Sequence, residues 1–265
     1  MKQSNSFSIS RLGMLFKQDY IENYRQLFLS SGFIVLLLSV IYILICANCR
    51  YYADDSIFNS NMKHHSIGWL VAVFIISGMI AGSSMFSSMR RSAGRLSTLM
   101  VPASQLEKFI ERWLVAVPGY IIVFALAAFV ADLIRIGFCE WILDRSTTVI
   151  TLSDIFDGVY PLPKKIATAL LLFMFAQSFF VLGSIVWQKL AVVKTFWVLV
   201  AIVAFYAAVA GWIMYTFQNP ELNYSNAGSM FDNDTLIYTG IAIATLFNYG
   251  TAYMRFRESE IINRW

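Results

Sequence analysis

The chain of 265 residues is poor in the side chains that carry most enzyme chemistry. It has only three cysteines and two histidines, and 14% of its residues are Asp, Glu, Lys or Arg. Three cysteines are too few for a disulfide scaffold. The sequence also lacks a P-loop, a nucleophile elbow and a glycine-rich phosphate-binding loop. We therefore expect no catalytic residues, no cofactor and no nucleotide hydrolysis by the chain itself.

Charge is missing from six long apolar stretches, which contain no Asp, Glu, Lys, Arg or His. Each is close to the ~20 residues that a helix needs to cross a bilayer. The stretches are residues 27–46, 67–86, 114–130, 166–186, 195–215 and 236–254. The third is the shortest and has Pro118 near its start. An all-α integral membrane protein with six transmembrane helices is expected, and the absence of intramembrane charge disfavours ion-coupled transport and intramembrane catalysis.

The distribution of Lys and Arg predicts the orientation of these spans. Fourteen of the twenty lie in the N-terminal segment, the second and fourth loops and the C-terminal tail, and six lie in the other loops. Because basic residues concentrate on the cytoplasmic side, both termini should be cytoplasmic. Residues 1–26 are too long and polar for the start of a signal peptide, so the first span should be retained.

The segment before the first span, residues 1–26, carries its own apolar pattern. Leu12, Phe16, Tyr20 and Tyr24 recur at a spacing of four, with polar residues on the opposite face. This pattern predicts an amphipathic helix in the membrane interface. Such a helix is either a plain anchor for the first span or an elbow helix that receives force from a cytoplasmic partner.

The cytoplasmic loop between the second and third spans predicts a second short helix. Pro102 ends the preceding segment, and Ser104 with Glu107 forms an S-x-x-E capping box at which a helix should begin. The apolar stripe of this helix comprises Leu106, Phe109, Ile110 and Trp113, and its charged residues are Glu107, Lys108, Glu111 and Arg112. It either serves topology alone or presents its charges to a docked protein, and the combination of cap, stripe and charge favours docking.

Small and polar residues within the spans predict where helices pack. The small residues are Gly78 and Gly82 in the second span, Ala204, Ala208 and Gly211 in the fifth, and Gly240 with Ala244 in the sixth. Small residues let helix backbones approach closely, either within the chain or between two copies. Gln177 and Ser178 in the fourth span and Asn248 in the sixth are expected to form hydrogen bonds between helices.

Three local motifs suggest other chemistry. Cys46 and Cys49 form a C-x-x-C of the kind that thiol oxidoreductases use, but only Cys139 remains for an electron relay. A metal site built from Asp54, Asp55, His64 and His65 is disfavoured, because adjacent histidines do not easily bind one ion. Two N-x-S/T glycosylation patterns begin at Asn223 and Asn233, and such short patterns arise by chance.

The layout resembles the permease subunits of type-2 ATP-binding-cassette exporters. Residues 99–114, LMVPASQLEKFIERWL, look like the loop that contacts the ATPase, and the tail 253–265, YMRFRESEIINRW, is similar to endings of small bacterial members. The resemblance implies a homodimer, or a pair with a second permease, bound to separate cytoplasmic ATPase subunits in the bacterial inner membrane. Residues 104–113 would be the coupling helix, with docking through Ser104, Glu107, Lys108, Phe109, Glu111, Arg112 and Trp113.

Under this hypothesis residues 27–254 form the transmembrane domain and residues 255–265 a cytoplasmic tail. The Phe-rich spans favour export of a hydrophobic or amphipathic substrate, and the basic clusters need no nucleic acid. Two other functions stay open: a non-catalytic membrane scaffold or sensor, and a membrane thiol oxidoreductase.

Overall fold

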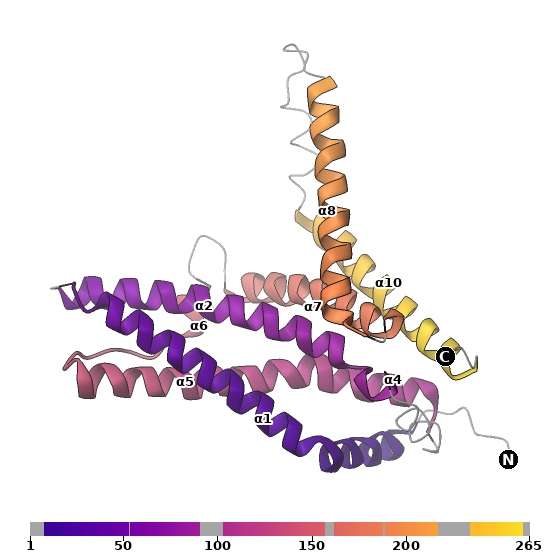
Figure 1. Ribbon diagram of the computed structural model, residues 1–265, viewed down its shortest axis with the longest axis horizontal. Coiled ribbons are helices and arrows are strands. Elements are labelled where there is room, and N and C mark those ends of the chain that lie inside the picture. Colours follow the sequence, from indigo (N-terminus) through magenta and orange to yellow (C-terminus); the bar gives the residue numbers. More distant parts are fainter. Residues whose placement is uncertain are drawn as a thin grey trace. The chain divides into compact units, whose positions relative to one another are not determined.

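In the computed structural model, every regular element of the described residues is helical (Figure 1). The structure describes residues 8–52, 54–90, 103–156, 162–187, 189–216 and 234–261. The expected all-α class is confirmed for this part of the chain. Pro102, the glycosylation pattern at Asn223, the acceptor Asn233 of the other pattern, residues 1–7 and the last four residues of the tail lie outside it.

Ten helical segments make up the described structure. They are α1 (Ile9–Cys49), α2 (Asp55–Ser84), the 3-10 turn η1 (Ser87–Arg90), α4 (Gln105–Leu114), the π-helix η2 (Val115–Gly119), α5 (Tyr120–Ile142), α6 (Leu152–Ile155), α7 (Leu162–Val186), α8 (Ala191–Thr216) and α10 (Asp234–Ile261). Pro118 lies inside η2. Because proline has no backbone N–H and its ring collides with the carbonyl four residues earlier, the helix widens there instead of continuing as a regular α-helix.

Five helices are long and apolar enough to cross a membrane, which fits a multi-pass membrane protein. They are α1, α2, the continuous helix Gln105–Ile142, Pro163–Val186 and Ala191–Trp212. The first, third, fourth and fifth predicted spans lie within α1, the helix Gln105–Ile142, α7 and α8, and the second ends two residues beyond α2. The sixth, residues 236–254, lies in α10, whose threonines, tyrosines and Asn248 make it less apolar, and it stays a prediction.

Several helices extend well beyond the predicted spans. α1 has 41 residues, about 60 Å at 1.5 Å per residue, which is twice the thickness of the hydrocarbon core. It joins the predicted elbow to the first span without a break and changes direction along its length (Figure 1). α5 continues past Val130 to Ile142, and α2 begins at Asp55, before the predicted span at residue 67. These helices are therefore longer than the ~20 residues that are needed to cross the hydrocarbon core.

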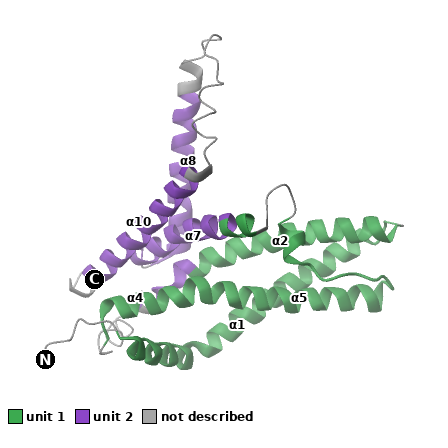
Figure 2. Cartoon of the chain, turned by 180° about the vertical axis from the view of Figure 1, so that it is seen from behind, with its two compact units in different colours: residues 1–81, 102–167 green, residues 82–101, 168–265 purple. Residues whose placement is uncertain are grey.

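The chain divides into two compact units (Figure 2), residues 1–81 with 102–167 and residues 82–101 with 168–265. In the first unit, α1 packs along α5 and α4 packs against α1. Tyr120 of α5 stacks on Phe74 of α2 with ring centroids 5.6 Å apart. The Tyr120 hydroxyl lies 2.7 Å from both the Phe74 carbonyl and the Ser77 hydroxyl. Hydrogen bonds thus supplement apolar packing between α2 and α5.

Close backbone approach and one predicted hydrogen bond organise the second unit. Asn248 of α10 donates to the Ser178 hydroxyl of α7 at 2.9 Å, as expected from the sequence. A Cβ added to Gly82 would lie 2.9 Å from Gln177, and a Cβ added to Gly183 would overlap the Thr195 hydroxyl. These glycines are therefore needed where helices meet.

The predicted packing residues differ in their surroundings. Gly78 and Gly82 of α2 are buried, and Gly82 lies close to Gln177. The small residues of α8 are exposed: Ala204, Ala208 and Gly211. Within its own unit, the described residues thus leave the small-residue face of α8 uncovered.

Candidate functional site

The predicted capping box at the start of α4 is present. The Ser104 hydroxyl accepts a hydrogen bond from the Glu107 N–H at 3.2 Å, and Glu107 Oε2 accepts one from the Ser104 N–H at 2.9 Å. These two bonds satisfy N–H groups that would otherwise lack partners at a helix start. The predicted start of the helix after Ser104 is confirmed.

Glu107 also joins α4 to the start of α1, across 99 positions of sequence. Its Oε1 accepts a hydrogen bond from the Ser8 N–H at 2.7 Å and lies 3.2 Å from Arg11 Nη2. The Glu107 side chain is fully buried. Burial opposes its ionisation, but the hydrogen bonds from Ser104 and Ser8 and the Arg11 charge outweigh burial and lower the pKa of Glu107. We call Ser8, Arg11, Ser104 and Glu107 the elbow joint.

The other residues of α4 divide into a buried and an outward face. Lys108, Phe109 and Glu111 are buried with Glu107. The side chains at positions 106, 110 and 113 share the opposite face; Leu106 is 42% exposed, and Ile110 and Trp113 are half-buried. Within the apolar stripe expected from the sequence, Phe109 is therefore buried while Leu106 is exposed. We call Leu106, Ile110 and Trp113 the outer stripe of α4.

The predicted apolar line along the elbow divides in the same way. Leu12 and Phe16 are half-buried, whereas Tyr20 and Tyr24 are 66% and 48% exposed. Asn23 donates to Asp19 at 2.7 Å on the half-buried side. Tyrosines that are exposed in the chain are suited to the membrane interface, where the ring is in an apolar layer and the hydroxyl in a wet one.

A pair of acidic residues lies where the elbow meets α4, before the predicted span at residues 114–130. Burial first, and then the Asp19 carboxylate, together raise the pKa of Glu111 to about 7 against the opposing charge of Arg112. Burial likewise raises the pKa of Asp19, against the hydrogen bond from Asn23 and the charge of Arg112. Glu111 Oε1 is buried without a hydrogen-bond partner. The junction therefore favours a protonated Glu111 up to near-neutral pH.

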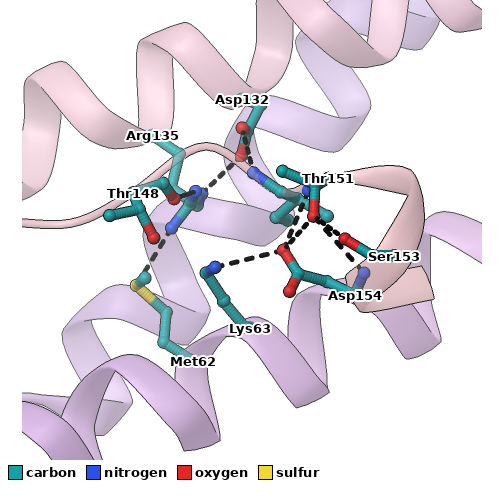
Figure 3. A network of polar contacts seen from close by, with 9 residues as sticks. Met62, Lys63, Asp132, Arg135, Thr148, Thr151, Ser153 and Asp154 are labelled. Carbon is teal, nitrogen blue, oxygen red and sulfur yellow. Dashed lines mark hydrogen bonds and ion pairs between the residues drawn. The ribbon is translucent and has the colours of Figure 1, made fainter. Parts of the chain in front are cut away.

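A second polar cluster forms at the far end of α5 (Figure 3). Arg135 is fully buried; its Nε donates to Asp132 Oδ1 at 2.7 Å and its Nη2 to the Thr148 carbonyl at 2.8 Å. Asp132 Oδ2 accepts from the Ile150 N–H at 2.9 Å. The ion pair thus binds the extended segment after α5 through that segment's own backbone, as a buried charge pair must if its desolvation is to be offset.

Further contacts hold the same segment to the start of α2. Lys63 pairs with Asp154 at 3.1 Å, and Arg145 pairs with Asp55 at 3.3 Å while lying 5.0 Å from the centre of the Phe58 ring. We call residues 143–155 with these side chains and the Asp132–Arg135 pair the outer clamp. In the sequence, residues 132–155 fall between the third and fourth predicted spans. An Asp and an Arg three positions apart at the end of an apolar helix are the signal that reveals the pair.

The cysteines pair differently from the C-x-x-C hypothesis. Cys46 of α1 is joined by a disulfide to Cys139 of α5, and Cys49 is a buried free thiol. Cys46 and Cys49 are therefore not the bonded pair, because α1 packs along α5 and brings Cys139 within reach. The residues of the disfavoured metal site are also apart: positions 55 and 65 are separated by about 15 Å along α2. The described residues contain no group of three or more potential metal ligands.

Comparisons of the chain with models of protein families, with curated proteins and with solved structures found no match. Any function assigned to the chain therefore depends on the chain's own geometry. Two polar networks are candidate functional sites in the described residues. One is the elbow joint, which lies beside the outer stripe of α4, and the other is the outer clamp at the opposite end of α1 and α5.

Proposed function

We propose that the chain is the permease subunit of an ATP-binding-cassette exporter, with six spans, cytoplasmic termini and a separate ATPase subunit docked on α4. The observation that carries this proposal is the elbow joint. It fixes an amphipathic N-terminal helix to a short capped helix between two spans, through a buried carboxylate with three donors. A surface helix that only connects and orients two spans would not need a buried carboxylate that bonds it to α1.

The joint gives a route by which a force on α4 reaches the membrane. α4 continues through η2 into α5, and α1 packs along α5. A push on α4 would therefore move the start of α1 and the third span together. In this account Glu107 is a positioning residue that ties the two helices, and the partner meets the outer stripe of α4.

The disulfide supports the proposed orientation. Arg11 precedes the first predicted span and Cys46 is its last residue, so in the proposed topology they would lie on opposite sides of ~30 Å of hydrocarbon. Disulfides persist outside the reducing cytosol. The outer clamp then faces the exterior and the elbow joint faces the cytoplasm, which agrees with the distribution of Lys and Arg.

Assembly and substrate follow as parts of the same proposal. A second permease copy, or a related permease, would cover membrane-embedded faces such as the exposed side of α8. Uncharged, Phe-rich spans suit a hydrophobic or amphipathic substrate, and the energy for its export would come from ATP hydrolysed by the partner. The bacterial inner membrane is the proposed location.

The test is affinity purification of the tagged full chain from its native membranes in mild detergent, followed by mass spectrometry. Leu106→Asp places a charge on the outer stripe, and Leu152→Asp is the matched control, since Leu152 is 60% exposed in the outer clamp. We expect a cassette ATPase to purify with the native chain and the control but to be lost with Leu106→Asp.

Other outcomes separate the competing functions. Recovery of a different cytoplasmic protein through the same stripe, with no ATPase, would favour the scaffold or sensor. The thiol oxidoreductase hypothesis is excluded if replacing Cys46 and Cys49 together leaves function intact.

A further inference from the structure

The three cysteines form one cluster that the proposed transport function does not use. Cys46 and Cys139 join α1 to α5, and Cys49 lies one turn further along α1, buried and unbonded. We propose that this cluster is a thiol–disulfide switch: Cys49 exchanges into the bond, giving a Cys46–Cys49 disulfide and releasing α5 from α1.

Spacing makes Cys46 the sulfur that Cys49 attacks. Residues three apart on a helix have Cβ atoms about 5–6 Å from each other, and a disulfide needs about 3.5–4.5 Å. Cys49 is the last residue of α1, and the chain turns directly after it, with the Tyr52 N–H bonded to the Cys49 carbonyl at 3.1 Å. A terminal turn can tighten by this amount without disturbing the rest of α1.

The exchange needs no oxidant or reductant. The Cys49 thiolate attacks Cys46 Sγ, the Cys46–Cys49 bond forms, and the Cys46–Cys139 bond breaks. Its electron pair leaves on Cys139 Sγ, which takes up a proton equivalent to the one that Cys49 gave up. One disulfide and one thiol are present before and after.

The surroundings of Cys139 show what the switch would control. Met62 Sδ lies 3.8 Å from Cys139 Sγ and 3.5 Å from Arg135 Nη1. The disulfide is thus adjacent to the buried ion pair of the outer clamp. Once the bond moves to Cys46 and Cys49, no disulfide joins α5 to α1. Packing and the hydrogen bond from Arg145 Nη1 to the Tyr52 carbonyl at 2.8 Å remain at this end, so the switch would loosen the attachment of α1 to the outer clamp.

The test follows where a thiol label appears. The purified full chain is incubated in detergent at pH 7, 8 and 9 without added thiol, then denatured in acid and labelled with N-ethylmaleimide. Trypsin cuts at Arg135 and Arg145, so Cys139 lies in the peptide of residues 136–145. In the starting form that peptide is linked to residues 26–50, and after exchange it is free and labelled.

We expect the labelled peptide to accumulate, at a rate that rises about tenfold for each pH unit below the thiol pKa, because only the thiolate attacks. The rate should not depend on protein concentration. Cys49→Ser should abolish labelling of Cys139. The proposal is overturned if residues 136–145 stay linked at every pH, or if Cys139 is labelled as fast in the Cys49→Ser variant.

Discussion

Replacing Glu107 by alanine should release the first turns of α1 from the start of α4. The substitution leaves the N–H groups of Ser8 and Ser104 and the Arg11 guanidinium without their shared acceptor. It also removes half of the capping box, so the start of α4 should loosen together with the start of α1.

The size of the effect follows from the contacts. Removing one partner of a buried ion pair costs about 3–5 kcal/mol. Since the Arg11 side chain is 28% exposed, it can turn towards solvent, and the low end applies. About 3 kcal/mol corresponds to a roughly 100-fold increase in local opening. Glu107→Gln keeps one carbonyl acceptor and should cost less, about 1 kcal/mol.

Hydrogen exchange with mass spectrometry in lipid nanodiscs measures this opening. Amides in the first turns of α1 and of α4 should exchange about 100-fold faster in Glu107→Ala, with Glu107→Gln between that variant and the native chain. Glu140, which is exposed on α5, supplies the control; Glu140→Ala should leave both segments unchanged. Faster exchange in α4 with no change in α1 would refute the joint, because Glu107 would then be only a helix cap.

Three further predictions concern other contacts. Arg135→Met should lower thermal stability by about 3–5 kcal/mol, because it leaves a buried carboxylate unpaired; an unchanged Tm would contradict the account of the outer clamp. Gly183→Ala should cost about 1–3 kcal/mol through overlap with the neighbouring helix, whereas Gly211→Ala, whose Cβ meets nothing within 4 Å, should be nearly neutral in the same melting assay. Burial and the nearby Asp19 carboxylate raise the pKa of Glu111 to about 7, so protonated Glu111 contributes fully to folding stability below its ordinary pKa and this contribution is lost as pH rises through about 7. Resistance of the α1–α4 junction to proteolysis should therefore fall from pH 5 to pH 8. Glu111→Gln should flatten this pH dependence.

Local signals in the sequence were enough to predict much of the helical structure. Uncharged apolar runs predicted the long helices, since a chain in lipid must satisfy its backbone internally. The S-x-x-E pattern predicted the start of α4. Three polar residues in apolar spans were predicted to form hydrogen bonds between helices, and two of them, Ser178 and Asn248, bond to each other. Each of these depends on neighbours in sequence or on the scarcity of polar partners in a membrane.

Contacts between distant segments could not be read in this way. Two of the three donors to the Glu107 carboxylate, Ser8 and Arg11, come from the start of α1. A residue expected to meet a partner is therefore buried within the chain. The disulfide depends on α1 packing along α5, and the C-x-x-C spacing pointed to the wrong pair. Arg135 lies beyond the predicted third span, so nothing in the sequence indicated that it is buried. Its acceptors, Asp132 and the Thr148 carbonyl, come together only in the folded outer clamp.

The central claim is that an ATPase docks on the outer stripe of α4. The direct measurement is photo-crosslinking in native membranes, with a photoreactive amino acid at position 106 and, as control, at position 152. The account predicts a crosslink from position 106 to a nucleotide-binding cassette protein and none from position 152. Crosslinks from position 106 to lipid alone, or to a protein that binds no nucleotide, would contradict it.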